Sequence, residues 1–461
     1  ADVILISGHV GGTGASPLTS IKYAGAPWEM GLTEVNQVLT LNNLRQRVTL
    51  RTDGGLRIGR DIVMAAMMGA EEYGIGTAAL IAMGCIMVRQ CHSNTCPVGV
   101  CTQDPELRRH FTGEPDHVVN LMKFIAEDVR EILAELGFRS LKDVIGRSDL
   151  LMQKSRGATD LDDLDLNPLL VQADPGPNQR YCTVEGRNEV PDALDENILT
   201  DAAHFFESGE KMHLTYSVTN TMRSIGARVS SYIVRNKDRD NFSDGQLTVD
   251  LRGVAGQSLG AFAAKGLKLK LYGEANDYVG KGLSGAVLVV RPPVSSSLRT
   301  NENVIIGNTC LYGATSGKLF AAGQAGERFA VRNSGALTVV EGCGSNGCEY
   351  MTGGIAVILG PVGDNFAAGM TGGMAFVYDE AGNFDVRLNP DSVVTQRLAS
   401  EYWEDRLVSL IEEHAAETGS IFARELLDQW TAALGKFWQI CPKEMLPRLR
   451  HPLHDMAEKR A

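Results

Sequence analysis

Four of the nine cysteines lie in one short stretch of the sequence, at Cys85, Cys91, Cys96 and Cys101. Cysteine thiolates are strong ligands for iron, and thiolates a few residues apart on one loop can enclose an iron–sulfur cluster. The gaps are wider than those of a zinc knuckle, although His92 could replace one thiolate in a zinc site. The pattern therefore favours an iron–sulfur cluster over zinc and over reduced cysteines that bind no metal.

Three glycine-rich stretches precede these cysteines, at residues 8–17 (GHVGGTGASP), 51–57 (RTDGGLR) and 73–79 (YGIGTAA). Loops with several glycines let backbone N–H groups approach a ligand, and the last two loops of a βα barrel commonly bind a phosphate. We therefore expect a phosphorylated cofactor at the second and third loops, with tight turns as the alternative explanation, and a ligand site at the first loop. His9 could contact cofactor or substrate, or could be a structural histidine at the end of a strand.

The elements that must hold these loops alternate between short apolar strands and amphipathic helices up to residue 151. Alternation of this kind predicts βα units with a parallel sheet. The expected elements are strands over 2–6 and 48–51 and helices over 33–45, 61–68 and 117–136. The first strand is an almost uninterrupted apolar run, which predicts burial on both faces. Because such a strand cannot stand alone, we expect this chain to be part of a longer polypeptide.

A second kind of pattern follows an Asp- and Pro-rich stretch that we interpret as a linker. Short apolar runs follow glycines that recur every 18 or 19 residues over much of the region between residues 266 and 373. A strand that recurs at this period, with glycine at each corner, is typical of a parallel β-helix whose turns stack on one another. Beyond residue 391 the apolar spacing predicts helices over 397–414 and 421–437.

Composition excludes two classes of partner. The formal net charge is −12 and no basic run is present, which argues against nucleic acid. The longest apolar run, at residues 78–88, falls short of the ~20 residues that a membrane-spanning helix needs. Clustered cysteines without a signal segment suit a metal site in a reducing compartment, so we expect a cytoplasmic protein.

Taken together, these motifs closely resemble the glutamate synthase family. The resemblance is carried by GHVGGTGASP, IKYAGAPWEMGL, TDGGLRIGRDI, YGIGTAALIAMGC and CIMVRQCHSNTCPVGVC. It implies an α/β plus β fold: the C-terminal half of a (βα)8 FMN-binding barrel, then a right-handed parallel β-helix and a helical C-terminal tail. The expected boundaries are residues 1–151 for the barrel part with its cysteine loop, 152–200 for the linker, 201–390 for the β-helix and 391–461 for the tail.

The resemblance also implies an oxidoreductase of ammonia assimilation and glutamate biosynthesis. In this reaction, ammonia from L-glutamine converts 2-oxoglutarate to 2-iminoglutarate, which takes hydride from reduced FMN and gives L-glutamate. Electrons would arrive through a [3Fe-4S] cluster, from NADPH by way of a small subunit with FAD and iron–sulfur clusters, or from ferredoxin. We favour NADPH. The amidotransferase and central domains of the large subunit would be further partners.

Carried over by position, the resemblance assigns the cluster to Cys85, Cys91 and Cys96, and it leaves out Cys101. It places the FMN phosphate on Asp53, Gly54, Gly55, Gly76 and Thr77, with Gly11, Gly12 and Thr13 near the flavin or substrate. Catalytic residues are not assigned, because most would precede Ala1. The alternatives are another FMN barrel oxidoreductase and a structural β-helix subunit that mediates interactions.

Overall fold

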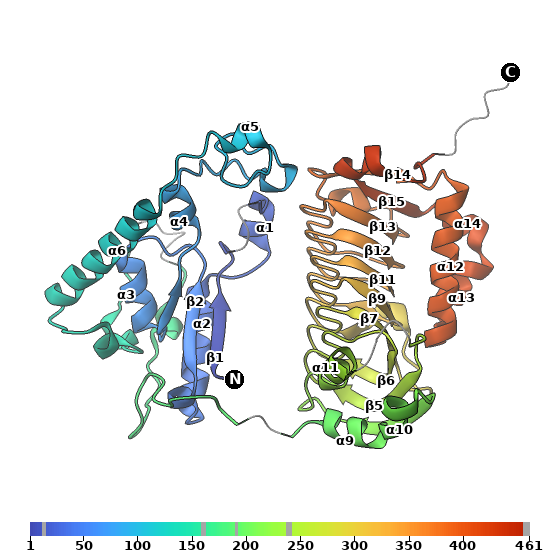
Figure 1. Ribbon diagram of the computed structural model, residues 1–461, viewed down its shortest axis with the longest axis horizontal. Coiled ribbons are helices and arrows are strands. Elements are labelled where there is room, and N and C mark those ends of the chain that lie inside the picture. The colour runs from blue at the N-terminus through green and yellow to red at the C-terminus, as the bar shows by residue number, and fades with distance from the viewer. Residues whose placement is uncertain (12–14, 158–162, 190–191, 237–241, 455–461) are drawn as a thin grey trace. The chain divides into compact units, whose positions relative to one another are not determined.

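The computed structural model describes all residues except 12–14, 158–162, 190–191, 237–241 and 455–461. The chain divides into two compact units, Ala1–Val190 and Pro191–Ala461 (Figure 1). Each unit buries its own hydrophobic side chains. Within the described residues, no helix is both long enough and apolar enough to span a bilayer.

The first unit contains a three-stranded parallel sheet in the order β1-β2-β3. Its strands are β1 (Val3–Ser7), β2 (Thr49–Asp53) and β3 (Glu72–Gly74). Ser7 pairs with Asp53, and Asp53 pairs with Gly74, so the carboxyl ends of all three strands lie side by side. The helices of this unit are α1 (Leu18–Tyr23), α2 (Trp28–Leu41), α3 (Gly59–Met67), α4 (Thr77–Ala82), α5 (Pro105–Arg108), α6 (Pro115–Glu135) and α8 (Asn167–Leu170).

The edge strand β1 is less buried than its sequence predicts. Val3 and Leu5 are 43% and 53% exposed, whereas Leu50 on the neighbouring strand is fully buried. The prediction that this strand is buried on both faces is therefore wrong for the described residues. The physical reason is that Val3 and Leu5 lie on the face of β1 opposite to Ile4 and Ile6, and only the latter face packs against the hydrophobic cluster that contains Leu50.

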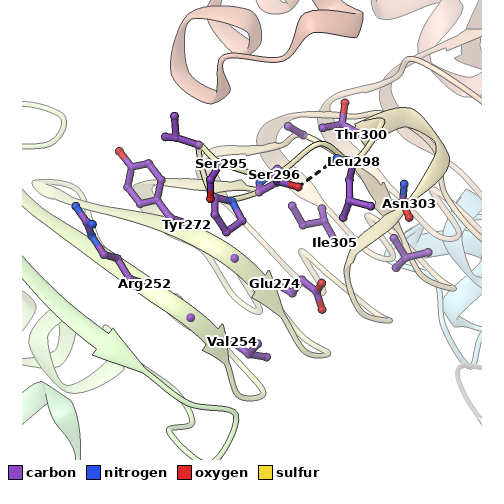
Figure 2. A pocket seen from close by; sticks show the side chains of 17 residues that line it. Arg252, Val254, Tyr272, Glu274, Ser295, Ser296, Leu298, Thr300, Asn303 and Ile305 are labelled. Carbon is purple, nitrogen blue, oxygen red and sulfur yellow. Dashed lines mark hydrogen bonds between the residues drawn. The ribbon is translucent and has the colours of Figure 1, made fainter.

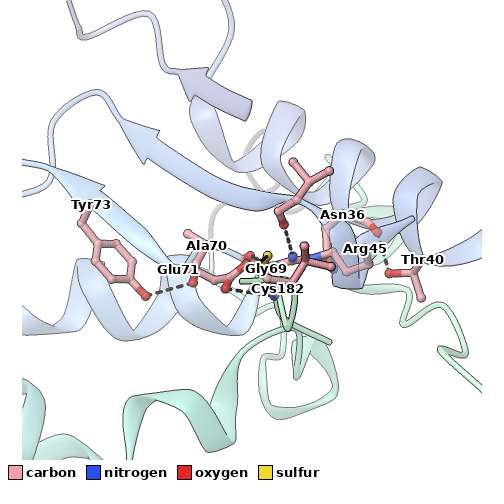
Figure 3. A network of polar contacts seen from close by, with 10 residues as sticks. Asn36, Thr40, Arg45, Gly69, Ala70, Glu71, Tyr73 and Cys182 are labelled. Atoms are coloured by element: carbon pink, nitrogen blue, oxygen red, sulfur yellow. Dashed lines mark hydrogen bonds and ion pairs between the residues drawn. The ribbon is translucent and has the colours of Figure 1, made fainter. Parts of the chain in front are cut away.

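A buried arginine joins distant segments of the first unit (Figure 3). Arg45 is 1% exposed, and it donates to Glu71 Oε1 at 2.7 Å and to the carbonyl oxygens of Val48 and Gly69 at 2.8 Å. Burial lowers the pKa of Arg45, while the Glu71 carboxylate opposes that shift. The second oxygen of Glu71 accepts the backbone N–H of Cys182 at 3.0 Å. This network attaches a segment of the expected linker to the unit that contains the three-stranded sheet.

The second unit is built on a twelve-stranded, mainly parallel sheet. Strands from β4 to β13 pair in parallel, and Figure 1 shows the strands from β5 to β13 stacked along the unit. The strands are β4 (Met212–Val218), β5 (Leu247–Ala255), β6 (Leu267–Ala275), β7 (Ser284–Arg291), β8 (Val304–Ile306), β9 (Ser316–Ala321), β10 (Gln324–Ala325), β11 (Ser334–Val340), β12 (Thr352–Ile358), β13 (Gly372–Tyr378), β14 (Val393–Arg397) and β15 (Phe437–Pro442). The helices are α9 (Leu194–Asp201), α10 (Ala203–Ser208), α11 (Ala227–Asn236), α12 (Glu401–Thr418), α13 (Ile421–Asp428) and α14 (Trp430–Leu434).

The two faces of this sheet bury different hydrophobic clusters. Leu251, Leu271 and Val290 occupy one row across adjacent strands, and all three belong to the larger cluster. On the opposite face, buried side chains such as Phe320 and Phe376 cluster with side chains of α12. Because strand residues alternate between faces, both clusters follow from the same strands.

The C-terminal region contains the expected helices and also two strands that the sequence pattern missed. The prediction of one helix over residues 421–437 is wrong beyond Leu434. Phe437 and Ile440 are fully buried in β15, which pairs antiparallel with β13 and with β14. Hydrogen bonding to an available sheet edge outweighs the helical spacing of these apolar residues.

Candidate functional site

The first two glycine loops meet where β1 and β2 end. Gly8 donates its N–H to the carbonyl oxygen of Asp53 at 2.9 Å, and Gly11 donates to Gly8 at 2.9 Å. Gly54 has φ +112°, and a Cβ atom at this position would lie 2.7 Å from Gly8 Cα. Side chains rarely adopt this φ, and the backbone of Gly8 leaves no room for one. The loops therefore form a glycine cradle, which we define as Gly8, Gly11, Gly54 and Gly55.

Two buried polar atoms beside this cradle have no hydrogen-bond partner among the described residues. They are Asp53 Oδ1 and His9 Nδ1. A Cβ atom on Gly11 would lie 3.5 Å from Asp53 Oδ1, so this carboxylate oxygen lies next to the first loop. A buried polar atom without a partner costs about 1–3 kcal/mol. A ligand that presents hydrogen-bonding groups here would remove that cost.

The third glycine loop follows β3, whose last residue, Gly74, pairs with Asp53. Gly76 precedes α4, and no heavy atom of the described residues lies within 4 Å of the position that its Cβ would take. No side chain caps the start of this helix. Backbone N–H groups at such a start need other partners, which an anion can supply. Thr77 is the first residue of α4.

The structure therefore brings four of the expected cofactor residues together and sets two more at the next strand end. Gly11, Asp53 and Gly54 are in close proximity, and Gly55, with φ +97°, lies against Val10. Gly76 and Thr77 are the two residues that lie after the next strand, β3. The expected residues Gly12 and Thr13 lie outside the described residues.

The cysteine loop follows α4 and winds tightly. Met87, Arg89 and Asn94 all have positive φ although none is glycine. Such a conformation costs roughly 1–2 kcal/mol per residue, so the surroundings must hold it. Asn94 is held by Thr102 Oγ1, which donates to its carbonyl oxygen at 2.8 Å. Arg89 donates from Nη1 to the carbonyl oxygen of Ser16 at 3.1 Å, which ties the cysteine loop to the first glycine loop.

The thiols of this loop differ in environment. Cys96 is buried; burial alone would raise its pKa, but hydrogen bonds from the backbone N–H groups of Cys101, Val98 and Val100 lower it overall. The thiol of Cys101 makes hydrogen bonds with Cys91 and Cys96. Although Cys101 is partly exposed, desolvation first and these neighbouring thiols second raise its pKa to about 12. Because the thiolate is the form that binds metal, Cys96 has the environment of a ligand.

The remaining cluster candidates are half-buried. Cys85 Sγ accepts the N–H of Met87 at 3.4 Å, and Cys91 begins a short 3-10 helix. Within the part of the chain that the structure describes, no three His, Cys, Asp or Glu side chains lie in an arrangement that could hold a metal ion. The donor chemistry of Cys96 nevertheless fits an iron–sulfur ligand, because backbone N–H groups already point at its sulfur.

Sequence reasoning missed the residues that position these loops. Arg89 and Asn94 are the clearest cases, because their roles depend on main-chain conformation and on partners distant in sequence. The short polar residues Asn94, Thr95 and Thr102 were only a weak signal of such a role, since side chains of this kind commonly form hydrogen bonds with nearby backbone.

Two protein families match this chain. Residues 1–139 match a family described as a conserved region in glutamate synthase. Residues 195–443 match a family described as the GXGXG motif, and this match covers more than half of the chain. The second match begins close to Pro191, where the second compact unit begins.

Relatives with curated descriptions match almost the whole chain. The glutamate synthase [NADPH] large chain of Azospirillum brasilense is 68% identical over 454 residues, which are 98% of this chain and 30% of the relative. Ferredoxin-dependent glutamate synthase 2 of Synechocystis sp. is 51% identical, with 96% of this chain and 28% of the relative covered. The corresponding values for the glutamate synthase [NADPH] large chain of Bacillus subtilis are 47%, 96% and 29%. This chain therefore spans less than a third of the length of these relatives.

Proposed function

This chain belongs to the glutamate synthase family as a C-terminal portion of the large subunit, and we propose that it supplies part of an FMN site and the cluster ligands for L-glutamate formation. The reaction is the reductive amination of 2-oxoglutarate with ammonia derived from L-glutamine. The observation that carries the proposal is the link between Arg89 and Ser16, because it connects the cysteine loop to the glycine cradle. An electron entry point and a flavin must lie close together to exchange electrons.

Residues of the first unit would hold FMN, which supplies the hydride when bound. The backbone N–H groups of Gly54, Gly55, Gly76 and Thr77 suit the phosphate, because the three glycines carry no side chain and no side chain caps the start of α4. The Asp53 carboxylate repels a phosphate, so it suits a hydroxyl group of the cofactor. Its unpartnered Oδ1 supports that role. Gly11, with Gly12 and Thr13, would border the flavin or the substrate.

Cys85, Cys91 and Cys96 would hold the [3Fe-4S] cluster. The lowered pKa of Cys96 supports a thiolate at that position. Cys101 contributes no ligand in this proposal, because the resemblance to the family assigns none to its position. Its sulfur lies beside Cys91 and Cys96, so variants at this position provide the sharpest test of the assignment.

The remainder of the large subunit would contribute the amidotransferase and central domains. We propose NADPH as the electron source, delivered by a small subunit with FAD and iron–sulfur clusters. The 68% identity to an NADPH large chain supports this choice over ferredoxin. A cytoplasmic location agrees with the clustered free cysteines.

The fold proposal has two parts. The exposed Val3 and Leu5 and the open edge of β1 support the completion of a (βα)8 barrel by chain outside this sequence. The parallel rows of the second unit support a right-handed β-helix: Ile355 pairs with Leu337 on one side and with Met374 on the other.

The decisive experiment for function uses the full-length large subunit with its small subunit. We expect bound FMN, iron and sulfide, and NADPH-dependent formation of glutamate from 2-oxoglutarate and glutamine. A large subunit that lacks flavin and iron and forms no glutamate with either NADPH or ferredoxin would overturn the proposal. Glutamate formation with reduced ferredoxin alone would overturn only the choice of electron donor.

A further inference from the structure

A cavity of about 810 Å³ lies in the second unit, between strands β5 and β6 and the loop of residues 292–303 (Figure 2). This volume is within the range of pockets that bind small organic molecules. Figure 2 shows Arg252 and Tyr272 at one end and Leu298 and Asn303 at the other. None of these residues belongs to the cofactor or cluster sites proposed above.

We call the face of the sheet that packs against α12 the outer face. The cavity lies where this face changes from apolar to charged. Under α12, one row of this face is apolar and fully buried, and it includes Phe320, Val339 and Val357. The same row continues through Val289 to Lys270 on β6. The face of the sheet at β5 and β6 is thus charged and accessible, whereas at β9 to β13 it is covered by a helix.

Three cations surround the ring of Tyr272, and one of them, Arg252, lines the cavity together with this ring. Arg252 pairs with Tyr272 across β5 and β6, and Tyr272 pairs with Arg291 across β6 and β7. The Arg252 and Arg291 guanidinium carbons lie 5.9 and 5.7 Å from the centre of the Tyr272 ring, and Lys270 Nζ lies 5.6 Å from it. Among the described residues, no carboxylate forms an ion pair with Arg252 or Lys270.

The rest of the cavity is largely apolar and keeps hydrophobic side chains in contact with water. Val254 and Leu298 are 44% and 56% exposed, and both line the cavity. Glu274, which pairs with Val254 across the strands, contributes the acidic group of the lining. An anion is therefore attracted to the Arg252 end and repelled from the Glu274 side, which sets a single orientation for a bound molecule.

We propose that this cavity binds a small organic anion with an apolar body, such as an alkyl or aryl carboxylate. The negative group lies at Arg252, beside the Tyr272 ring that Lys270 and Arg291 also flank, and the apolar body covers Val254 and Leu298. Its residues differ from those proposed for FMN and for the cluster, so it is a second ligand site. Charge complementarity and exposed apolar walls in one cavity together identify this class of ligand.

The test uses the fluorescent probe 8-anilinonaphthalene-1-sulfonate, an apolar anion, with the full-length large subunit. We expect saturable binding that octanoate displaces at a concentration at least ten-fold lower than octan-1-ol. Arg252→Glu should raise the Kd of the probe at least ten-fold, because a charge-assisted contact is replaced by repulsion. Val254→Asp should weaken binding similarly, since it adds a negative charge to the apolar wall.

The matched control is Arg397→Glu, because the Arg397 guanidinium also stacks on an aromatic ring, 3.8 Å from the centre of Trp438, but does not line the cavity. This variant should change the Kd less than two-fold. Far-UV circular dichroism confirms that each variant is folded. Equal probe affinity of the wild type and folded Arg252→Glu would overturn the proposal, as would equal displacement by octanoate and octan-1-ol.

Discussion

Substitution of Gly54 by alanine tests the glycine cradle directly. The φ of +112° is unfavourable for alanine by about 1–3 kcal/mol. In addition, the new Cβ atom would lie 2.7 Å from both the N and the Cα of Gly8, and rotation of a side chain cannot relieve contact with backbone. Without a ligand the two loops can move apart, but a bound cofactor requires them in place. We expect this difference to reduce FMN binding by at least about 3 kcal/mol, or roughly a hundred-fold.

The measurement is the Kd of FMN in the full-length large subunit, from the quenching of flavin fluorescence on binding. Flavin content after gel filtration gives an independent value. Circular dichroism must show that the variant keeps its secondary structure, so that loss of FMN reports on the site.

Gly137→Ala is the matched control. Gly137 also has a positive φ, of +80°, but no heavy atom of the described residues lies within 4 Å of the position that its Cβ would take. Alanine at this position has the unfavourable φ, but its Cβ atom contacts none of the described residues. FMN affinity should therefore change less than two-fold. If folded Gly54→Ala binds FMN within three-fold of the wild type, the cradle does not contact the cofactor.

Two further predictions concern stability, measured as the free energy of unfolding in urea. Glu71→Ala should destabilise the first unit by about 3–5 kcal/mol because it leaves the buried Arg45 guanidinium unpaired, whereas Glu72→Ala, which removes an exposed ion pair, should cost less than about 1 kcal/mol. Equal effects of these variants would contradict the role of burial. Ile358→Ala, in the larger cluster of the second unit, should cost about 2–5 kcal/mol, and Val386→Ala, at 80% exposure, less than about 0.5 kcal/mol. A loss below 1 kcal/mol for Ile358→Ala would contradict close packing between the stacked strands.

The candidate loops could be located from the sequence because local composition specifies them. Glycine clusters after apolar strands predicted ligand-binding loops at residues 8–17 and 51–57, and the structure has Gly54 of the second loop against Gly8 of the first. The unpartnered Asp53 Oδ1 could not be predicted, because burial of one oxygen depends on the packing of the loops. The tie from Arg89 to Ser16 joins residues far apart in sequence, and no periodicity encodes such a contact.

In the fold too, features set by local sequence could be predicted, whereas features set by contacts between distant residues could not. Recurring glycines predicted the parallel strands of the second unit. The helix predicted over residues 421–437 ended early because Phe437 and the residues after it complete a sheet edge provided by β13. The exposure of Leu5 on β1 was also hidden from the sequence, since burial depends on which elements pack against each face of a strand.

The most direct test of the central claim is the iron content and low-temperature EPR spectrum of the oxidised full-length enzyme with one cysteine replaced. We predict that Cys96→Ser loses iron and the cluster signal, because a hydroxyl is a poorer iron ligand than a thiolate, and that reduction by NADPH falls with it. Cys101→Ser should keep the wild-type signal and glutamate formation. Loss of iron in Cys101→Ser, together with a normal cluster and full activity in Cys96→Ser, would contradict the account.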